Sequence, residues 1–199
     1  KPLSPVATPL ASALGRTLAV DVVARVDVPG FDNSAMDGYA VRAADVAAVP
    51  VRLPVVEDIP AGRTAVGPLA PGTAHRIMTG APVPSGADAV VQVEWTDGGT
   101  SEVRVDRPVV VGQNVRKMAD DVAVGTAVLD AGVVLGPAQL GLAAALGFGS
   151  LPVRRRPRVL VLSTGSELVG PGVALEPGQI YESNGVMLAA AVREAGGEA

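Results

Sequence analysis

Proline and glycine divide the middle of this chain into pieces that are too short for long helices. The 199 residues include 24 Gly and 17 Pro, and between Pro50 and Val111 these separate valine-rich runs such as VVEDI and AVVQV. Valine favours strands, whereas proline and glycine interrupt the interiors of helices and strands. The region is therefore typical of a small β domain or barrel, and TDGGT at residues 96–100 predicts a hairpin turn within it.

The segments on either side of this region predict a few further elements. We expect a short helix over residues 8–14, because a capping threonine and a proline begin it and a glycine follows it. Residues 16–28 alternate apolar and polar side chains, as a strand does. GTAVLDAGVVL at 125–135 predicts a hairpin, and GPAQLGLAAALGFG at 136–149 predicts a buried helix. We interpret residues 151–158 as a linker.

The last segment predicts the opening of a parallel α/β domain. RVLVL at 158–162 is almost wholly apolar, which is typical of a strand buried on both faces, and the turn STGSEL follows it. SNGVMLAAAVREAGGEA at 183–199 then has the caps and the apolar face of a helix. Because a parallel strand needs a second strand beside it, we expect this chain to be a fragment that stops within a doubly wound domain.

Composition excludes several classes of site. The chain has no Cys and one His, which excludes disulfides, thiolate nucleophiles, zinc–thiolate sites and two-His metal sites within it. Any metal would be a hard ion with oxygen ligands, such as Mg²⁺. The net charge of −4 argues against a nucleic-acid partner, and RRRPR at 154–158 fits a solvated linker. No apolar run approaches the ~20 residues of a membrane helix, so we expect no membrane partner either.

The loop PGFDNSAMDGYAVRAADV, residues 29–46, gathers scarce aromatic residues among polar turn formers. It contains Phe31 and Tyr39, whereas the whole chain has 2 Phe, 2 Tyr and 1 Trp. The polar residues could satisfy backbone amides locally and make this a purely structural loop. Alternatively, Gly38 presents Asp37 to a ligand, where the carboxylate could hold a metal ion or accept a proton.

Three further loops could also carry chemistry. RIMTGAPVPSGADAVV at 76–91 suits an anion cradle or, equally, a rigid connection between strands. GQNVRKMADD at 112–121 sets Arg and Lys beside acids, which suits phosphate binding or a solvated turn with local ion pairs. STGSEL at 163–168 follows the predicted buried strand, where ligands bind in open α/β sheets, although such turns are common without function. His75 has no visible partner, and we interpret it as structural.

Together and in this order, these loops resemble the molybdopterin molybdenumtransferase family, which includes the E domain of gephyrin. The resemblance rests on DVPGFDNSAMDGYAVRAAD, RIMTGAPVPSGADAVV, GQNVRKMADD, and PRVLVLSTGSELV followed by PGQIYESNGVML. It covers essentially the whole chain, and the first of these motifs is close to diagnostic.

The resemblance implies a multidomain α+β fold. Residues 1–24 and 120–153 would form a discontinuous domain of helices and strands that carries much of the dimer contact. Residues 25–119 would form a small, barrel-like β domain inserted in it. Residues 154–199 would be the truncated start of a doubly wound α/β domain that binds molybdopterin.

The resemblance also implies an enzyme that inserts molybdenum from molybdate into adenylated molybdopterin and releases AMP. This reaction uses Mg²⁺ or a similar divalent ion and gives molybdenum cofactor. The family implies a cytoplasmic homodimer, with the molybdopterin adenylyltransferase as a further partner. We expect the isolated chain to be inactive, because the family's pterin-binding loop and molybdate-binding residues come later in the sequence. A gephyrin-like scaffold and a fragment that binds ligand without turnover remain as alternatives.

The family's functional residues transfer to single positions of this chain. Asp37 and Glu167 would be catalytic, and together with Asp121 they would bind the metal ion. The expected substrate-binding residues are Asn33, Ser34, Thr79, Arg116, Thr164 and Ser166. The chain departs from the family pattern at three places: Ala119 replaces a common glycine, Met118 interrupts a basic run, and Ser166 stands where many relatives carry Asp.

Overall fold

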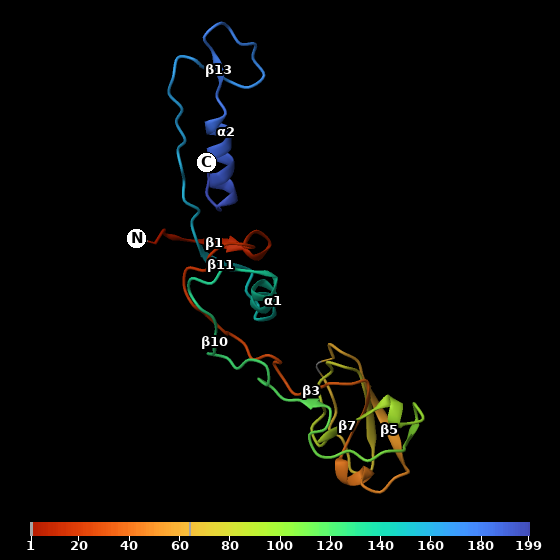
Figure 1. Ribbon diagram of the computed structural model, residues 1–199. Helices are drawn as coiled ribbons and strands as arrows, with labels where there is room; N and C mark the ends of the chain where they lie inside the picture. The colour runs from red at the N-terminus through yellow and green to blue at the C-terminus, as the bar shows by residue number, and fades with distance from the viewer. Residues whose placement is uncertain (1, 64) are drawn as a thin grey trace. The chain divides into compact units, whose positions relative to one another are not determined.

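The computed structural model describes residues 2–63 and 65–199 (Figure 1). These residues form two compact units. The first, called here the terminal unit, combines Lys1–Val22 with Ala127–Ala199, and the second, the β unit, is Val23–Thr126. The boundaries expected at residues 24, 119 and 153 remain predictions.

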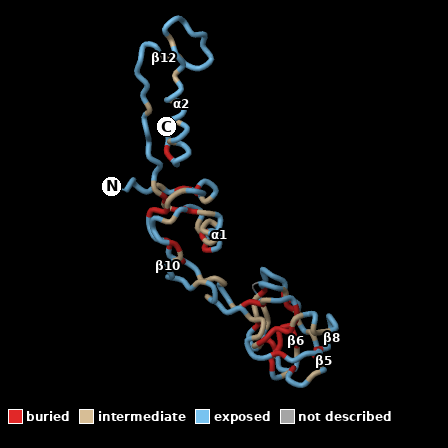
Figure 2. The backbone as a smooth tube through the Cα atoms, in the orientation of Figure 1, coloured by how far each residue is buried: buried red, intermediate tan, exposed pale blue. Residues whose placement is uncertain are grey.

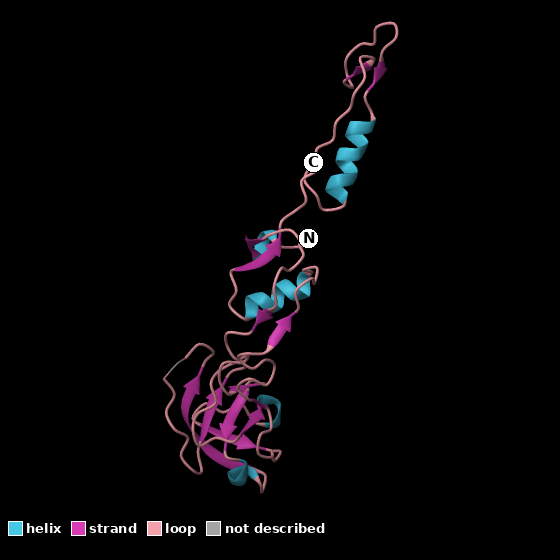
Figure 3. Ribbon diagram, turned by 90° about the vertical axis from the view of Figure 1, so that its left-hand side faces the viewer, coloured by secondary structure: helices cyan, strands magenta, loops and turns pink. Residues whose placement is uncertain are grey.

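A five-stranded sheet is the centre of the β unit, whose strands are drawn in magenta in Figure 3. The strands follow the order β7-β4-β6-β5-β8. Only β5 and β6 run parallel to each other, and every other neighbouring pair is antiparallel. The strands are β4 (Gly38–Val41), β5 (Val51–Ile59), β6 (Ala74–Ile77), β7 (Ala89–Gln92) and β8 (Glu102–Val105). This confirms the predicted β character of the middle of the chain.

Three strands of the sheet, β7, β4 and β6, are buried on both faces, whereas β5 and β8 alternate buried and more exposed residues. Because side chains alternate along a strand, Tyr39 and Val41 join one apolar cluster while Ala40 joins another. Buried residues, red in Figure 2, gather near β6 in this unit. The predicted turn at 96–100 is confirmed, because the Asp97 N–H donates to the Arg104 carbonyl oxygen at 3.2 Å.

Several short elements lie outside the five-stranded sheet. A two-residue ladder joins β3 (Asn33–Ser34) to β9 (Val115–Arg116). The remaining short elements are β2 (Val22–Val23), the 3₁₀ helices η2 (Ala43–Val46) and η3 (Val93–Trp95), and β10 (Ala127–Leu129) in the terminal unit.

The terminal unit begins with a strand where we predicted a helix. Residues 8–14 contain the end of β1 (Pro5–Pro9) and the short 3₁₀ helix η1 (Leu10–Ser12). β1 pairs antiparallel with β11 (Ser150–Arg154), which also lies partly in the predicted linker. Pro9 favours an extended conformation for the residue before it, Thr8, and this opposes a helix start there. The pairing of β1 with the distant strand β11 therefore outweighs the local helix signal.

The remaining expectations for the terminal unit are partly met. The helix is confirmed as α1 (Pro137–Ala145), but it is not buried as expected: of its residues only Ala143 is buried, and it packs in a cluster with Leu18, Leu135 and Leu151. The hairpin predicted at 125–135 is wrong, because Val134 bridges Thr17 instead of folding back on the preceding residues.

The C-terminal segment has a helix but lacks the predicted buried strand. α2 (Asn184–Glu194) confirms the helix, and β12 (Leu168–Val169) pairs in parallel with β13 (Ile180–Tyr181). Residues 158–162, however, form only one isolated bridge, and Leu160 is 81% exposed. The expectation of a strand buried on both faces is wrong here because neighbouring strands do not flank it among the described residues. No helix in the described ranges is long and apolar enough to cross a membrane.

We predict that Gly38→Ala lowers the free energy of unfolding by about 3 kcal/mol, because an added Cβ would overlap the Val91 carbonyl oxygen of β7. Gly141→Ala is the matched control, because a Cβ on this helical residue of α1 has open space. It should raise stability by roughly 0.5–1 kcal/mol. Urea unfolding measures both, and equal effects of the two substitutions would contradict the close approach at Gly38.

Candidate functional site

The β4–β6 register brings Asp37 and Thr79 together. Gly38 pairs with Ile77, so the residue before β4 lies beside the residues that follow β6. Asp37 Oδ1 accepts hydrogen bonds from the Thr79 N–H at 2.7 Å and from the Thr79 hydroxyl at 2.8 Å. The Asp37 side chain is exposed, so it can still reach a ligand.

These hydrogen bonds make Asp37 a stronger acid. They hold the pKa of the Asp37 carboxyl below its usual value, with the Thr79 N–H contributing most and the hydroxyl second. A lowered pKa means that the bonds stabilise the fold above the usual pKa and that this contribution is lost as the pH falls below about 4. Asp37 is therefore an anion at neutral pH, as a metal ligand or a proton acceptor must be.

The loop after β6, residues 78–84, is called here the threonine loop, and it is hydrogen-bonded to β3. The Ser34 N–H donates to the Ala81 carbonyl oxygen at 3.0 Å, and the Gly80 N–H donates to the Ser34 carbonyl oxygen at 2.8 Å. Gly80 has φ +79°, a conformation that favours glycine. The opening loop, residues 29–46, and the threonine loop thus form one hydrogen-bonded platform.

Asn33 and Ser34 lie inside this platform. Ser34 is fully buried and its hydroxyl donates to the Met36 carbonyl oxygen at 2.5 Å. Asn33 is 5% exposed, and its amide donates to the Phe31 carbonyl oxygen at 3.2 Å. These are the local hydrogen bonds to the backbone that a purely structural loop would make. A substrate-binding role for either residue remains a prediction.

Arg116 lies on a turn, residues 112–121, which is called here the basic turn. Arg116 Nη2 donates to Asp121 Oδ2 at 2.5 Å, and both side chains are about half exposed, 49% and 50%. Two non-glycine residues of this turn have positive φ, Asn114 at +56° and Ala119 at +66°. The left-handed Ala119 explains why glycine suits this position.

Glu167, Thr164 and Ser166 belong to the terminal unit, whereas Asp37 belongs to the β unit. All three side chains are exposed. Thr164 lines a groove with Glu182 and Asn184 before α2. Their catalytic, substrate-binding and metal-binding roles remain predictions.

Sequence reasoning did not select Asp32 and Glu182. Glu182 accepts hydrogen bonds from the Ser163 hydroxyl at 2.8 Å and the Gly185 N–H at 2.6 Å. The Gly185 N–H, followed by the Ser163 hydroxyl, lowers the pKa of the Glu182 carboxyl. For Glu182, the available sequence signal was its position just before the predicted helix at 183–199, where a carboxylate is favourable.

The acids of the described residues suit a metal ion only in part. Within residues 2–63 and 65–199, no three His, Cys, Asp or Glu side chains are grouped to hold a metal ion. Asp121 is paired with Arg116, whereas only one carboxylate oxygen of Asp37 is used by Thr79. Mg²⁺ often takes one or two carboxylates and completes its shell with water and substrate phosphates, and Asp37 fits that pattern.

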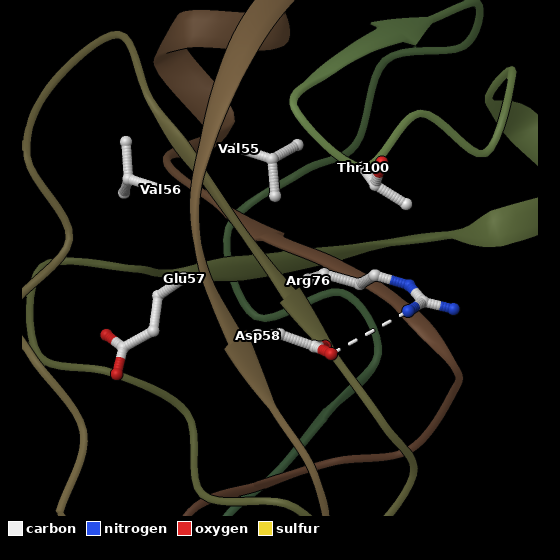
Figure 4. Close-up of a pocket in the computed structure, with 6 residues that line it drawn as sticks. All are labelled: Val55, Val56, Glu57, Asp58, Arg76 and Thr100. Atoms are coloured by element: carbon white, nitrogen blue, oxygen red, sulfur yellow. Dashed lines mark ion pairs between the residues drawn. The ribbon is translucent and has the colours of Figure 1, made fainter.

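Two other features involve none of the predicted site residues. Figure 4 shows a pocket lined by residues 55–58 of β5, Arg76 of β6 and Thr100, in which Asp58 and Arg76 form an ion pair at 3.7 Å. His75 is 2% exposed within β6, and its Nδ1 lies 3.4 Å from Glu57 Oε2. Burial lowers the pKa of His75, in keeping with the structural interpretation.

Comparison with known proteins identifies the family. Residues 2–147 match the family model described as MoeA N-terminal region (domain I and II). The chain belongs to this family. It is 59% identical over 196 residues to molybdopterin molybdenumtransferase 2 of Mycobacterium tuberculosis strain H37Rv, covering 96% of this chain and 48% of the relative. It is 42% identical over 195 residues to the molybdopterin molybdenumtransferase of Bacillus subtilis, covering 94% and 45%.

The MoeA fold is shared as well. The crystal structure of the molybdopterin biosynthesis moeA protein from Pyrococcus horikoshii OT3 has a TM-score of 0.87 and 38% sequence identity to this chain. The match covers 98% of this chain and 53% of that structure. The chain therefore spans about half the length of the MoeA relatives that it matches.

We predict that Thr79→Val raises the pKa of Asp37 without restoring its usual value. Valine removes the hydroxyl donor, but the N–H of residue 79, which contributes more, remains. A ¹³C NMR titration of the Asp37 carboxyl measures this shift. Thr73→Val, which removes a hydroxyl bonded to the Ala70 carbonyl oxygen, should leave the pKa of Asp37 unchanged. An unchanged Asp37 pKa in Thr79→Val would contradict the geometry.

We predict that Ala119→Gly raises the free energy of unfolding by about 1 kcal/mol, because it removes the cost of a left-handed alanine. Ala144→Gly, in the helical region of α1, should instead lower it by about 1 kcal/mol. Urea unfolding distinguishes the two, and a loss of stability in both variants would show that residue 119 is not left-handed.

Proposed function

We propose that this chain contributes the β-domain part of a molybdopterin molybdenumtransferase site. The enzyme would insert molybdenum from molybdate into adenylated molybdopterin and release AMP. The observation that carries the proposal is the exposed Asp37 carboxylate, held ionised by two hydrogen bonds from Thr79, in a chain that matches the MoeA family. The relatives reported above are named for this activity or for molybdopterin biosynthesis, so a scaffold role is not favoured.

The chemistry requires neutralised phosphate charge. Cleavage of a phosphoanhydride-like bond is assisted by a divalent ion and by arginine, which stabilise the charge that develops on the oxygens. Arg116 is half exposed and uses one terminal nitrogen in its pair with Asp121, so its other N–H groups can donate to a phosphate. Thr79 acts mainly through Asp37, because its hydroxyl and its N–H both donate to that carboxylate.

Mg²⁺ fits the donors that this chain offers. One Asp37 oxygen is not used by Thr79 and would bind the ion, with substrate oxygens and water as further ligands. The ion would supply charge neutralisation for the leaving phosphate. Asp121 would join it only after leaving Arg116.

The remaining parts of the proposal rest on the resemblance. Glu167, Thr164 and Ser166 would act from the α/β domain of one subunit, facing the β domain of the other, in a cytoplasmic homodimer. Adenylated molybdopterin would come from the molybdopterin adenylyltransferase.

A hybrid enzyme tests this function. Residues 2–199 replace the matching half of the Mycobacterium tuberculosis relative, of which they cover 48%. We expect the hybrid to release AMP from adenylated molybdopterin when molybdate and Mg²⁺ are added. A folded, dimeric hybrid that binds the substrate but releases no AMP would contradict the proposal and support ligand binding without turnover.

Within that hybrid, Asp37→Asn should lower the turnover rate by roughly 10²–10³-fold, because the amide cannot act as an anionic ligand or base. Asp106→Asn is the control, since Asp106 is an exposed aspartate just after β8 whose ion-pair partner is Arg104, at 3.0 Å. The rate of AMP release and the thermal unfolding of both variants are compared. Wild-type turnover in Asp37→Asn would reduce Asp37 to a loop anchor.

A further inference from the structure

Asp32 connects three of the loops described above. Its carboxylate accepts hydrogen bonds from the Met118 N–H at 2.9 Å and from Lys117 Nζ at 2.7 Å, both on the basic turn. Its carbonyl oxygen accepts a hydrogen bond from the Val83 N–H of the threonine loop at 3.0 Å. One residue of the opening loop therefore holds both of the other loops.

The opening loop supplies acceptors to most of the basic turn after Arg116. Besides Met118, the Ala119 N–H donates to the Pro29 carbonyl oxygen at 3.0 Å, and the Asp121 N–H donates to the Val28 carbonyl oxygen, just before the loop, at 2.9 Å. Asp32 thus accepts a hydrogen bond from Met118, the residue directly before the left-handed Ala119. This bond fixes the turn beside the residue whose backbone conformation is unfavourable.

The same contacts restrain the two cations of the basic turn. Lys117 Nζ donates one of its three N–H groups to Asp32, which ties the lysine to the opening loop. Arg116 pairs with Asp121 through one nitrogen and retains other N–H donors. The hydrogen bond from Lys117, followed by that from the Met118 N–H, lowers the pKa of the Asp32 carboxyl.

We propose that Asp32 is a positioning residue that fixes the orientation of Arg116 toward a phosphate ligand without touching that ligand. This inference rests on the proposed function, in which Arg116 meets the phosphate. Asp32 acts through the basic turn, because its carboxylate is used by Lys117 and by the Met118 N–H. Such indirect support commonly affects ligand affinity by about tenfold or more.

The first test measures order in the basic turn of the chain itself. NMR hydrogen exchange is followed at the Ala119 and Asp121 amides, whose bonds to the Pro29 and Val28 carbonyl oxygens the substitution does not itself remove, in wild type and in Asp32→Ala. The matched control is Asp45→Ala, which removes a similar bond, from the Gly72 N–H to Asp45 Oδ2 at 2.8 Å, elsewhere in the β unit. We expect exchange at these two amides to accelerate by about tenfold only in Asp32→Ala. Unchanged exchange at Asp121, the partner of Arg116, would overturn the proposal.

The second test separates positioning from simple stabilisation. The affinity of the chain for inorganic pyrophosphate with Mg²⁺ is titrated by NMR in wild type, Asp32→Ala, Arg116→Met and the double variant. We expect Asp32→Ala to weaken binding by about tenfold in wild type and by less than about twofold in the Arg116→Met background. An equal loss in both backgrounds would overturn the proposal, because Asp32 would then act independently of Arg116.

Asp32→Asn refines the result. Asparagine keeps an acceptor for the Met118 N–H but cannot pair with Lys117, so partial retention of affinity is expected. If the wild-type chain binds no pyrophosphate, the proposed role of Arg116 and its positioning toward phosphate are both overturned, and the exchange measurement then shows only whether Asp32 orders the basic turn.

Discussion

The antiparallel register between β4 and β6 determines where the chemistry of the β unit lies. Gly38 pairs with Ile77, and this pairing sets Asp37 beside Thr79. A slip by one residue would send Tyr39 and Ala40 to the opposite faces of a sheet whose two faces are both packed. Gly38 also permits β7 to approach, because a side chain there would overlap the Val91 carbonyl oxygen. The core thus specifies the position of an exposed carboxylate.

Around this register, three loops are connected by hydrogen bonds rather than by regular structure. β3 and β9 share only two residue pairs, yet Ser34 adds bonds to the threonine loop and Asp32 adds bonds to the basic turn. The basic turn also carries matched charges, with Arg116 paired to Asp121 and Lys117 paired to Asp32 of the opening loop. Exposed ion pairs contribute little stability, so we propose that these two pairs serve mainly to orient the cationic side chains.

Local sequence patterns predicted the helices and strands that depend on local sequence. They failed where pairing with a distant strand determines the secondary structure. Valine runs cut by proline and glycine predicted the β region, and apolar periodicity predicted α1 and α2. The helix expected at 8–14 is wrong because β1 pairs with β11, which lies far along the chain. The motifs pointed to Asp37, Thr79 and Arg116, but no local signal revealed that Asp37 meets Thr79 or that Asp32 joins three loops. Those contacts follow from strand register and long-range pairing.

We propose that Asp37 and Thr79 act as one unit, and a double-mutant cycle on AMP release measures their coupling. The hybrid enzyme is assayed as wild type, Thr79→Val, Asp37→Asn and the double variant. We predict that Thr79→Val slows AMP release in the wild-type background but changes the rate by less than about twofold once Asp37 is asparagine. If the two effects multiply, Thr79 acts on the substrate independently of Asp37, and the two residues do not form one unit.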